Sequence, residues 1–273
     1  MKSEVPPSTS EFRPPSSNVP KAILLDIEGT TTPIAFVYDV LFPYARAHLR
    51  AYLEDPANRD ALVEPLRMLQ EQRSRDEGPP EGGPHEYGHE GGPHEYGHEG
   101  GPHEYIVWLM DRDRKSPALK LLQGQIWERG YRTGELKGDV FADVAPAFAR
   151  WTAAGIRIAI YSSGSELAQR LLFGTARDGD LTTMISGFFD TRVGAKASAA
   201  SYGTIARALD CPPGNILFIS DVTAELDAAA SAGFQVLLCE RPGNHPQPNH
   251  AFNIIRTFDD VDLPRKHDNT TSS

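Results

Sequence analysis

The chain has 273 residues, and 40% of them are hydrophobic, enough to bury the core of one large domain or of a core with a smaller companion. The formal net charge of -10 excludes a general nucleic-acid or acidic-membrane binder, because the overall field would repel either partner. Cys211 and Cys239 show no disulfide-like spacing, which is typical of a reducing compartment.

Polar segments stand at both ends of the sequence. Residues 1–20 are rich in proline and serine, so we expect a disordered tail rather than a secretory signal or a membrane span. Residues 263–273 contain too little apolar material to dock firmly, and we expect a second disordered tail there. With no targeting segment visible, we expect a cytoplasmic protein, and its mass of 29.9 kDa is compatible with passive entry into a nucleus.

Short apolar runs alternate with segments of helical periodicity. Each run is followed by polar or turn residues, as expected of buried strands, and this alternation predicts an α/β fold with a Rossmann-like parallel sheet. The predicted strands are residues 22–27, 156–162, 216–220 and 235–239, and the predicted helices between them are residues 143–154, 165–173, 198–209 and 223–232.

Residues 36–134 lack this strand rhythm, and their apolar positions recur at helical spacing. We therefore expect a helical cap inserted into a catalytic core formed by residues 21–35 and 135–262. An insertion between the first two predicted strands suits a cap over the carboxyl ends of the sheet, where open parallel sheets bind ligands.

A tandem repeat interrupts the predicted cap. The sequence GGPHEYGHE occurs at residues 82–90 and 91–99, and a truncated GGPHEY follows at 100–105. Its glycine and proline content predicts a flexible polar loop over residues 81–105. Its histidines suit a soft divalent metal but lack a rigid frame, so a repeat expansion without function is the alternative. They are His85, His89, His94, His98 and His103.

Two carboxylates follow the first predicted strand. Asp26 and Glu28 are separated by one residue, and Gly29 permits an abrupt turn, so both side chains can face one site. A carboxylate is a competent nucleophile toward a phosphoryl group if a cation offsets the charge repulsion. A second carboxylate can then protonate the leaving oxygen and activate water. The alternative is an acidic strand end followed by an ordinary turn.

Three further groups follow later strands. Ser162 and Ser163 precede a predicted helix, where hydroxyls and amides can hold phosphate or simply cap the helix, as Ser165 also can. Lys196 can neutralise phosphate, although exposed lysines are common. Asp221 can contribute to a hard-cation site, or it can simply favour a helix N-terminus, as can Glu225 and Asp227 one turn beyond.

Along the chain these groups occur in the order acid pair, hydroxyl, lysine and acid. The chain resembles the haloacid-dehalogenase superfamily, whose four motifs have the same order. The narrower patterns DIEGTTTPI, LQGQIWERGYRTGELKGDVFADV, YSSGS and FISDVTAELDAAASAG resemble the enolase-phosphatases, or acireductone synthases, of methionine salvage. The resemblance covers about residues 21–262; the long N-terminal segment and the nonapeptide repeat depart from it and leave every motif residue intact.

The resemblance implies roles for particular residues. These are Asp26 as nucleophile, Glu28 as acid and base, Ser162 as phosphate binder, Lys196 as charge stabiliser and Asp221 as magnesium ligand. We further expect Ser163 and Lys196 to bind the phosphate, and Asp26 and Glu28 to join Asp221 in holding one Mg²⁺ per subunit. The implied substrate is 2,3-diketo-5-methylthiopentyl-1-phosphate, which a monomer would enolise and then dephosphorylate to the acireductone. The enolisation base is not assigned by the sequence, although Glu28 is a candidate.

Three alternatives remain open at this point. The first is another magnesium-dependent phosphatase of small metabolites on the same fold, because cap residues such as Trp127 and Tyr131 carry little readable chemistry. The second is a halide-removing hydrolase, which would need no magnesium. The third is a non-enzymatic protein that binds metal or a partner through the histidine repeat.

Overall fold

The computed structural model describes residues 12–14, 19–76, 101–112, 114 and 116–263. The chain forms two compact units. One contains Met1–Val40 and Tyr131–Ser273, and the other contains Leu41–Gly130. The first holds the sheet and the second is helical throughout the part that the structure describes.

The sheet has six strands in the order β3-β2-β1-β4-β5-β6, and every neighbouring pair is parallel. The central strands are fully buried because helices cover both of their faces, and such strands are built from continuous apolar runs. The strands are β1 (Ala22–Leu25), β2 (Arg157–Tyr161), β3 (Ile185–Phe189), β4 (Ile216–Ser220), β5 (Gln235–Cys239) and β6 (Ile254–Ile255).

The predicted α/β class with a parallel sheet is confirmed, and four of these strands coincide with the predicted runs. The sequence analysis missed β3 and β6. In β3, Ser186 and Gly187 interrupt the apolar run and only Phe188 is buried, while β6 is two residues long. Both strands lie at the edges of the sheet.

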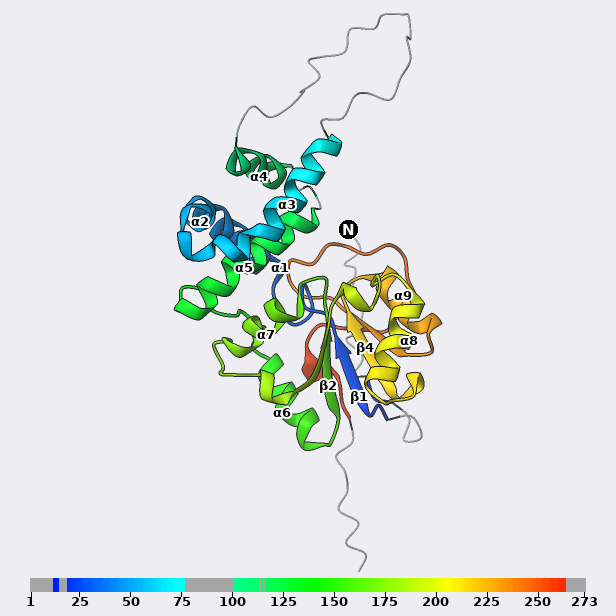
Figure 1. Cartoon of the computed structure of the whole chain (residues 1–273). Coiled ribbons are helices and arrows are strands. Elements are labelled where there is room, and N and C mark those ends of the chain that lie inside the picture. The colour runs from blue at the N-terminus through cyan, green and yellow to red at the C-terminus, as the bar shows by residue number, and fades with distance from the viewer. Residues whose placement is uncertain (1–11, 15–18, 77–100, 113, 115, 264–273) are drawn as a thin grey trace, which may run out of the picture. The chain divides into compact units, whose positions relative to one another are not determined.

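Helices cover the two faces of the sheet (Figure 1). Helices α8 (Ala199–Ala208) and α9 (Thr223–Ser231) pack against alternate strand residues such as Leu24 and Phe218 in one apolar core. On the other face lie α6 (Val144–Ala153) and α7 (Glu166–Gly174), which contact β2 and β3. Short helical turns at α1 (Ile34–Phe36) and η2 (Val37–Leu41) lead out of this unit.

In the described part of the second unit, four α-helices share an apolar core that includes Leu49, Ile106 and Leu122. Proline stands in the first turn of α2 and at the first position of α4 and of α5, where its missing N–H has no helical partner to lose. The helices are α2 (Phe42–Glu54), α3 (Arg59–Asp76), α4 (Pro102–Asp111) and α5 (Pro117–Thr133), the last of which runs on into the first unit.

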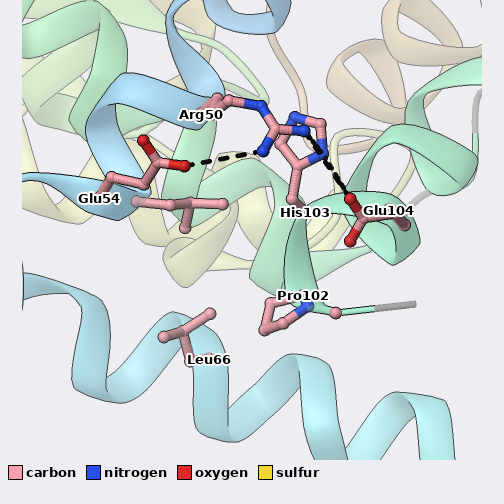
Figure 2. A pocket seen from close by; sticks show the side chains of 8 residues that line it. Arg50, Glu54, Leu66, Pro102, His103 and Glu104 are labelled. Carbon is pink, nitrogen blue, oxygen red and sulfur yellow. Dashed lines mark hydrogen bonds and ion pairs between the residues drawn. The ribbon is translucent and has the colours of Figure 1, made fainter.

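The third copy of the repeat corrects one prediction. The expected flexible loop extended to residue 105, but Pro102 starts α4 and Tyr105 is only 3% exposed in the helical core. Proline is tolerated at a first helical position, and the apolar residues after Tyr105 supply the buried face. His103 lies beside Arg50, its Nδ1 3.3 Å from Nη2, at a hollow between α2, α3 and α4 (Figure 2). The other repeat histidines, His85, His89, His94 and His98, lie outside the described residues.

Part of the predicted N-terminal tail also packs on the first unit. The amide of Phe12 donates to the Asp260 carbonyl (2.8 Å), and Asp262 N donates to the Phe12 carbonyl (3.1 Å). Backbone pairing of Phe12 with residues 260–262 thus anchors part of a segment that the composition predicts to be disordered. The rest of both predicted tails lies outside the described residues, apart from residues 13–14, 19–20 and 263. Within the described parts, no helix is long and apolar enough to cross a membrane.

Candidate active site

The loop after β1 carries the predicted acid pair. Asp26 N donates to the Ile219 carbonyl (3.0 Å), so the pairing of β1 with β4 extends to Asp26. The amides of residues 30–32 all donate to the Ile27 carbonyl, at 3.1, 2.9 and 2.9 Å, which folds the chain back at once. Gly29 has φ 72°, and a Cβ there would lie 2.3 Å from Oδ2 of Asp221. This position therefore requires glycine for both its conformation and its close approach.

Asp26 forms a buried ion pair with Lys196. The Lys196 Nζ atom lies 2.5 Å from Oδ1 of Asp26 and 2.8 Å from Oε2 of Glu225. The side chains of Asp26 and Lys196 are 3% and 12% exposed. Burial alone would lower the pKa of Lys196, but the surrounding carboxylates, with Asp26 the strongest, raise it above its ordinary value. The amine therefore stays charged beside Asp26.

Glu28 faces the loop after β2. The Ser162 hydroxyl, which is fully buried, donates to Oε2 of Glu28 at 3.4 Å. Burial raises the pKa of Glu28, and the neighbouring charge of Asp26 raises it further. An acid with a raised pKa retains its proton to a higher pH, which suits a group that must protonate a leaving oxygen.

Two serines after β2 have different roles: one caps a helix and the other contacts Glu28. Ser165 is the N-cap of α7, where its Oγ accepts from the amide of Ala168 at 3.2 Å. Ser162 Oγ accepts from the amide of Gly164 at 3.0 Å and turns toward Glu28. Ser163 is exposed between them. The helix-capping alternative therefore applies to Ser165, and Ser162 lies with the acid pair.

Asp221 follows β4 and lies against the same loop, as its approach to Gly29 indicates. Burial raises the pKa of Asp221 to about 7, and the charges of Asp26 and Glu225 contribute to that rise. Burial and Asp26 likewise raise the pKa of Glu225, whose Oε2 accepts a hydrogen bond from Ser220 Oγ at 2.9 Å. The structure thus brings together Asp26, Glu28, Ser162, Lys196, Asp221 and Glu225. Ser165 caps α7 instead, and Ser163 and Asp227 are exposed.

Hydroxyl groups fix the backbone that presents Lys196. The carbonyls of residues 194, 195 and 196 accept hydrogen bonds from Tyr161 Oη (2.9 Å), Ser201 Oγ (2.8 Å) and Tyr202 Oη (2.8 Å), respectively. Gly194 has φ 133°, and a Cβ there would lie 2.2 Å from Ser201 Oγ. The lysine stands on a short loop whose three carbonyls are all occupied.

Sequence reasoning found the charged groups but not their supports. It did not identify Tyr161 and Tyr202 as supports of Lys196, because buried aromatic residues on a strand and a helix are indistinguishable from ordinary core. It also missed Arg241 and Asn244, which follow β5 and bond to the loop after β1. Their position at the carboxyl end of a predicted strand was the available signal.

The donor set fits a small hard cation. Asp26 and Asp221 offer buried carboxylate oxygens, and within the described residues no group of three His, Cys, Asp or Glu side chains forms a closed metal site. Mg²⁺ is commonly held by only one or two carboxylates, with water and substrate phosphate completing its shell. Burial, and after it the charge of Asp26, raises the pKa values of Asp221 and Glu225, and a bound cation would favour the charged forms of these carboxylates.

Comparison with known proteins agrees with this geometry. Residues 20–233 match the family model for haloacid dehalogenase-like hydrolases. The chain is 48% identical over 239 residues to an enolase-phosphatase E1 of Synechococcus elongatus, covering 88% of this chain and 96% of that protein. The chain belongs to the enolase-phosphatase E1 family.

One more related protein and one similar crystal structure extend the comparison. A protein of Oryza sativa described as a probable bifunctional methylthioribulose-1-phosphate dehydratase/enolase-phosphatase E1 is 42% identical over 259 residues, which cover 91% of this chain and 48% of that protein. The crystal structure of the UTR4 protein of Saccharomyces cerevisiae matches with a TM-score of 0.66 and 33% identity, covering 88% of this chain and 99% of that one. The match to an enolase-phosphatase E1 thus extends across both units.

Proposed function

We propose that this protein is a magnesium-dependent enolase-phosphatase that converts 2,3-diketo-5-methylthiopentyl-1-phosphate to the acireductone 1,2-dihydroxy-3-keto-5-methylthiopentene and phosphate. The observation that carries the proposal is the buried contact between Asp26 and Lys196, with Glu28 and Asp221 on the same loop cluster. A carboxylate, a fixed cation and a second acid are the groups needed to transfer a phosphoryl group to a side chain.

Phosphate removal begins at Asp26. One carboxylate oxygen attacks phosphorus, the bond between phosphorus and the substrate oxygen breaks, and the phosphoryl group stays on the side chain. The ammonium of Lys196, already 2.5 Å from Oδ1, stabilises the negative charge that spreads over the phosphoryl oxygens. Ser162 and Ser163 bind those oxygens from the loop after β2.

Glu28 acts in both halves of the phosphatase reaction. Its raised pKa favours the protonated form that gives a proton to the departing oxygen. The resulting carboxylate then takes a proton from water, which attacks phosphorus and releases phosphate from Asp26. The hydrogen bond from Ser162 orients Glu28 for this exchange.

Asp26 and Asp221 would hold the metal, and Glu28 as a third ligand stays a prediction. When bound, Mg²⁺ supplies charge neutralisation for the phosphate and acidifies the carbon next to a chelated diketone. Burial and the charge of Asp26 raise the pKa of Asp221 to about 7, so a cation bound there would compete with a proton for this carboxylate.

The rice relative supports the choice of substrate. Dehydration of methylthioribulose-1-phosphate, the reaction in that protein's name, removes water from a ketose phosphate and gives this 2,3-diketone phosphate. In a chain with both activities, an enolase-phosphatase would act on the product of the dehydratase. We further propose that the helical unit is a substrate-selecting cap, and that the enzyme is a cytoplasmic monomer.

The test is phosphate release from the diketone phosphate with and without Mg²⁺, while the absorbance of the enol product is followed. Magnesium-dependent release accompanied by the enol signal supports both activities. Turnover of a generic phosphate ester but not of the diketone phosphate would reject methionine salvage and retain a phosphatase. Release that is indifferent to chelation of all divalent cations would reject the metal assignment.

A further inference from the structure

We propose that Arg241 and Asn244 are positioning residues of the reaction, which hold the loop carrying Asp26 and Glu28 in its working conformation. Both residues lie in the segment after β5, and neither belongs to the predicted catalytic set. The proposal concerns the loop from Asp26 to Thr32, here called the nucleophile loop. Its kinetic consequences rest on the proposed function, whereas its structural consequences do not.

The nucleophile loop satisfies the amides of residues 29–32 internally but leaves three of its backbone carbonyls to donors from outside. The amides of Thr30, Thr31 and Thr32 all turn inward to one carbonyl, that of Ile27. The carbonyls of residues 29, 30 and 31 must therefore find donors elsewhere. Buried carbonyls without a donor are costly, so these donors determine whether the loop keeps its shape.

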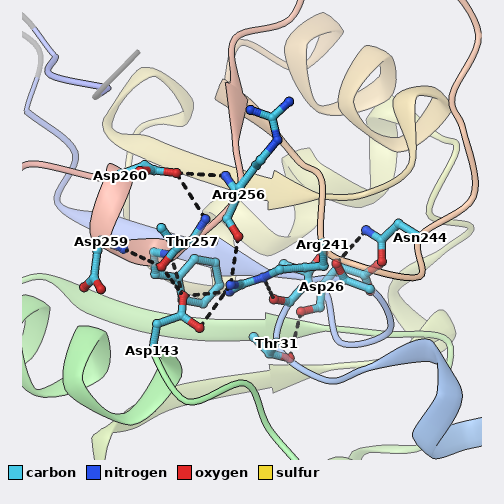
Figure 3. A network of polar contacts seen from close by, with 12 residues as sticks. Asp26, Thr31, Asp143, Arg241, Asn244, Arg256, Thr257, Asp259 and Asp260 are labelled. Carbon is cyan, nitrogen blue, oxygen red and sulfur yellow. Dashed lines mark hydrogen bonds and ion pairs between the residues drawn. The ribbon is translucent and has the colours of Figure 1, made fainter. Parts of the chain in front are cut away.

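Three donors from outside the loop meet these three carbonyls in turn. Asn244 Nδ2 donates to Gly29 (2.9 Å), Arg241 Nε donates to Thr30 (3.2 Å), and the amide of Phe141 donates to Thr31 (3.0 Å). Two of the three are side chains, and both come from the same short segment. Figure 3 shows Arg241 and Asn244 extending toward the loop beside Asp26.

Arg241 is itself rigidly held. Its guanidinium donates two hydrogen bonds to the carboxylate of Asp143, at 3.0 and 2.8 Å, and one to the carbonyl of Arg256 at 3.0 Å. The rings of Phe141 and Phe258 lie against it, with centroids 4.4 and 4.9 Å from Cζ. Its side chain is 4% exposed, so the Nε atom is aimed at Thr30 by a fixed frame.

Asn244 bridges the sheet and the loop. Its Nδ2 also donates to the carbonyl of Cys239, the last residue of β5, at 3.1 Å. Its Oδ1 is buried without a hydrogen-bond donor and would lie 2.9 Å from a Cβ on Gly29. Gly29 is thus enclosed between Asn244 and Asp221. A shift of the loop would therefore change the distances from Asp26 to both Asp221 and Lys196.

These contacts assign positioning rather than catalysis, because both side chains bond to backbone and not to reacting atoms. A displacement of about 1 Å in a reacting group can reduce a rate roughly a hundredfold. Loss of either donor should therefore lower kcat while leaving substrate affinity nearly intact, because Ser162, Ser163 and Lys196 stand on other loops.

The experiment compares Asn244→Ala, Asn244→Asp and Arg241→Lys with two controls from the same region, Asn253→Ala and Arg256→Ala. Asn253 is exposed, and the side chain of Arg256 is 40% exposed beside Glu240. For each variant, kcat and KM are measured with the diketone phosphate and with p-nitrophenyl phosphate, together with amide exchange of the nucleophile loop and of β4. The aspartate variant keeps the size of Asn244 and removes its donor, while the lysine variant keeps a cation beside Asp143.

We expect kcat to fall by about tenfold to a hundredfold in the three test variants, with KM changed by less than about threefold. Exchange of the amides of residues 30–32 should rise by about tenfold or more while β4 stays protected. The controls should match the wild type. Loop exchange at the wild-type level, kcat within about twofold of the wild type, or equal loss of protection in β4 would each overturn the proposal. Should the wild type turn over neither substrate, the proposed function falls and loop exchange alone decides this inference.

Discussion

Lys196 Nζ lies 2.5 Å from Oδ1 of Asp26, although 170 residues separate them in the chain. The parallel sheet makes this contact possible, because Asp26 follows β1 and Lys196 lies in the segment after β3, so both stand at the carboxyl edge. The pair is buried, and its charges are therefore poorly screened by solvent. Asp26 is held beside a fixed cation before any substrate arrives.

Asp26→Asn tests the nucleophile. The amide has the same size but lacks the nucleophilic charge, so phosphate release should fall by roughly a thousandfold or more while the fold persists. Phosphate release and far-UV circular dichroism measure the two effects. Asp227→Asn, at an exposed position on α9 six residues beyond Asp221, is the matched control and should retain activity. Substantial turnover by Asp26→Asn would reject the covalent assignment.

Glu28→Gln separates the two halves of the reaction. The amide cannot deliver a proton to the leaving oxygen or take one from water, so we expect kcat to fall by about a hundredfold to ten-thousandfold. Hydrolysis of the phosphorylated enzyme should slow as well, and Asp26 should then carry phosphate in rapidly quenched samples examined by peptide mass spectrometry. Wild-type steady-state rates would contradict the role of Glu28 as acid and base.

Tyr202→Phe tests the support of the lysine loop. The variant removes only the hydroxyl that donates to the Lys196 carbonyl at 2.8 Å. We expect kcat to fall by a factor of about ten and stability to fall by about 1 kcal/mol, the usual value of one hydrogen bond. Tyr52→Phe, which removes a hydroxyl within the helical unit, is the control. A loss of stability with unchanged kcat would leave Tyr202 a purely structural residue.

Much of this arrangement could be predicted because its signals are local. Continuous apolar runs predicted β1, β2, β4 and β5, and charged or hydroxyl residues directly after three of them predicted Asp26, Ser162 and Asp221. Strand β3 was not predicted, because Ser186 and Gly187 interrupt its apolar pattern. An edge strand also needs fewer buried side chains than a central strand.

The residues that hold the catalytic loops in place could not be predicted from the sequence in the same way. Arg241 resembles any polar residue in a loop until the fold brings Asp143, Phe141 and Phe258 around it. Contacts between residues far apart in the sequence are not visible in the local hydrophobic periodicity from which helices and strands were predicted. The repeat shows the converse error, because the low complexity of residues 100–105 concealed Tyr105, which the core of the helical unit requires.

Asp143 predicts a pH-dependent contribution to stability. Burial opposes its charge, but hydrogen bonds from Arg241 and the Phe258 amide outweigh that effect and lower the pKa of Asp143 below its ordinary 3.8. Because the folded pKa is depressed, the stabilisation is fully present above the ordinary value. It is lost as the pH falls below 3.8 toward the folded value.

Urea unfolding of the wild type and Asp143→Asn at several pH values measures this contribution. At neutral pH the variant should be roughly 3 kcal/mol less stable, because Arg241 loses its buried partner. The difference should narrow as the pH falls below 3.8 toward the folded pKa of Asp143. Asp259→Asn, at a surface ion pair with Arg150, should change stability by less than about 1 kcal/mol. A difference for Asp143→Asn that does not vary with pH would exclude its charge as the source.

The repeat offers a final test, because all three copies begin with the same sequence, GGPHEY. Deletion of residues 82–99 leaves a single GGPHEY before Ile106, so the start of α4 with Pro102 and Tyr105 is preserved. We expect this variant to keep the melting temperature and kcat of the wild type. Deletion of residues 82–105 removes Tyr105 as well and should lower stability by roughly 3 kcal/mol, the usual cost of truncating a large buried aromatic residue.

The two deletions differ by one copy of the repeat, so their comparison isolates what that copy contributes. Thermal unfolding and phosphate release measured side by side distinguish a structural role from a functional one. A melting temperature equal in both variants would show that Tyr105 is dispensable to the helical core. Loss of kcat in the shorter deletion, with its melting temperature unchanged, would instead assign a function to residues 82–99, which the buried contacts of the third copy do not require.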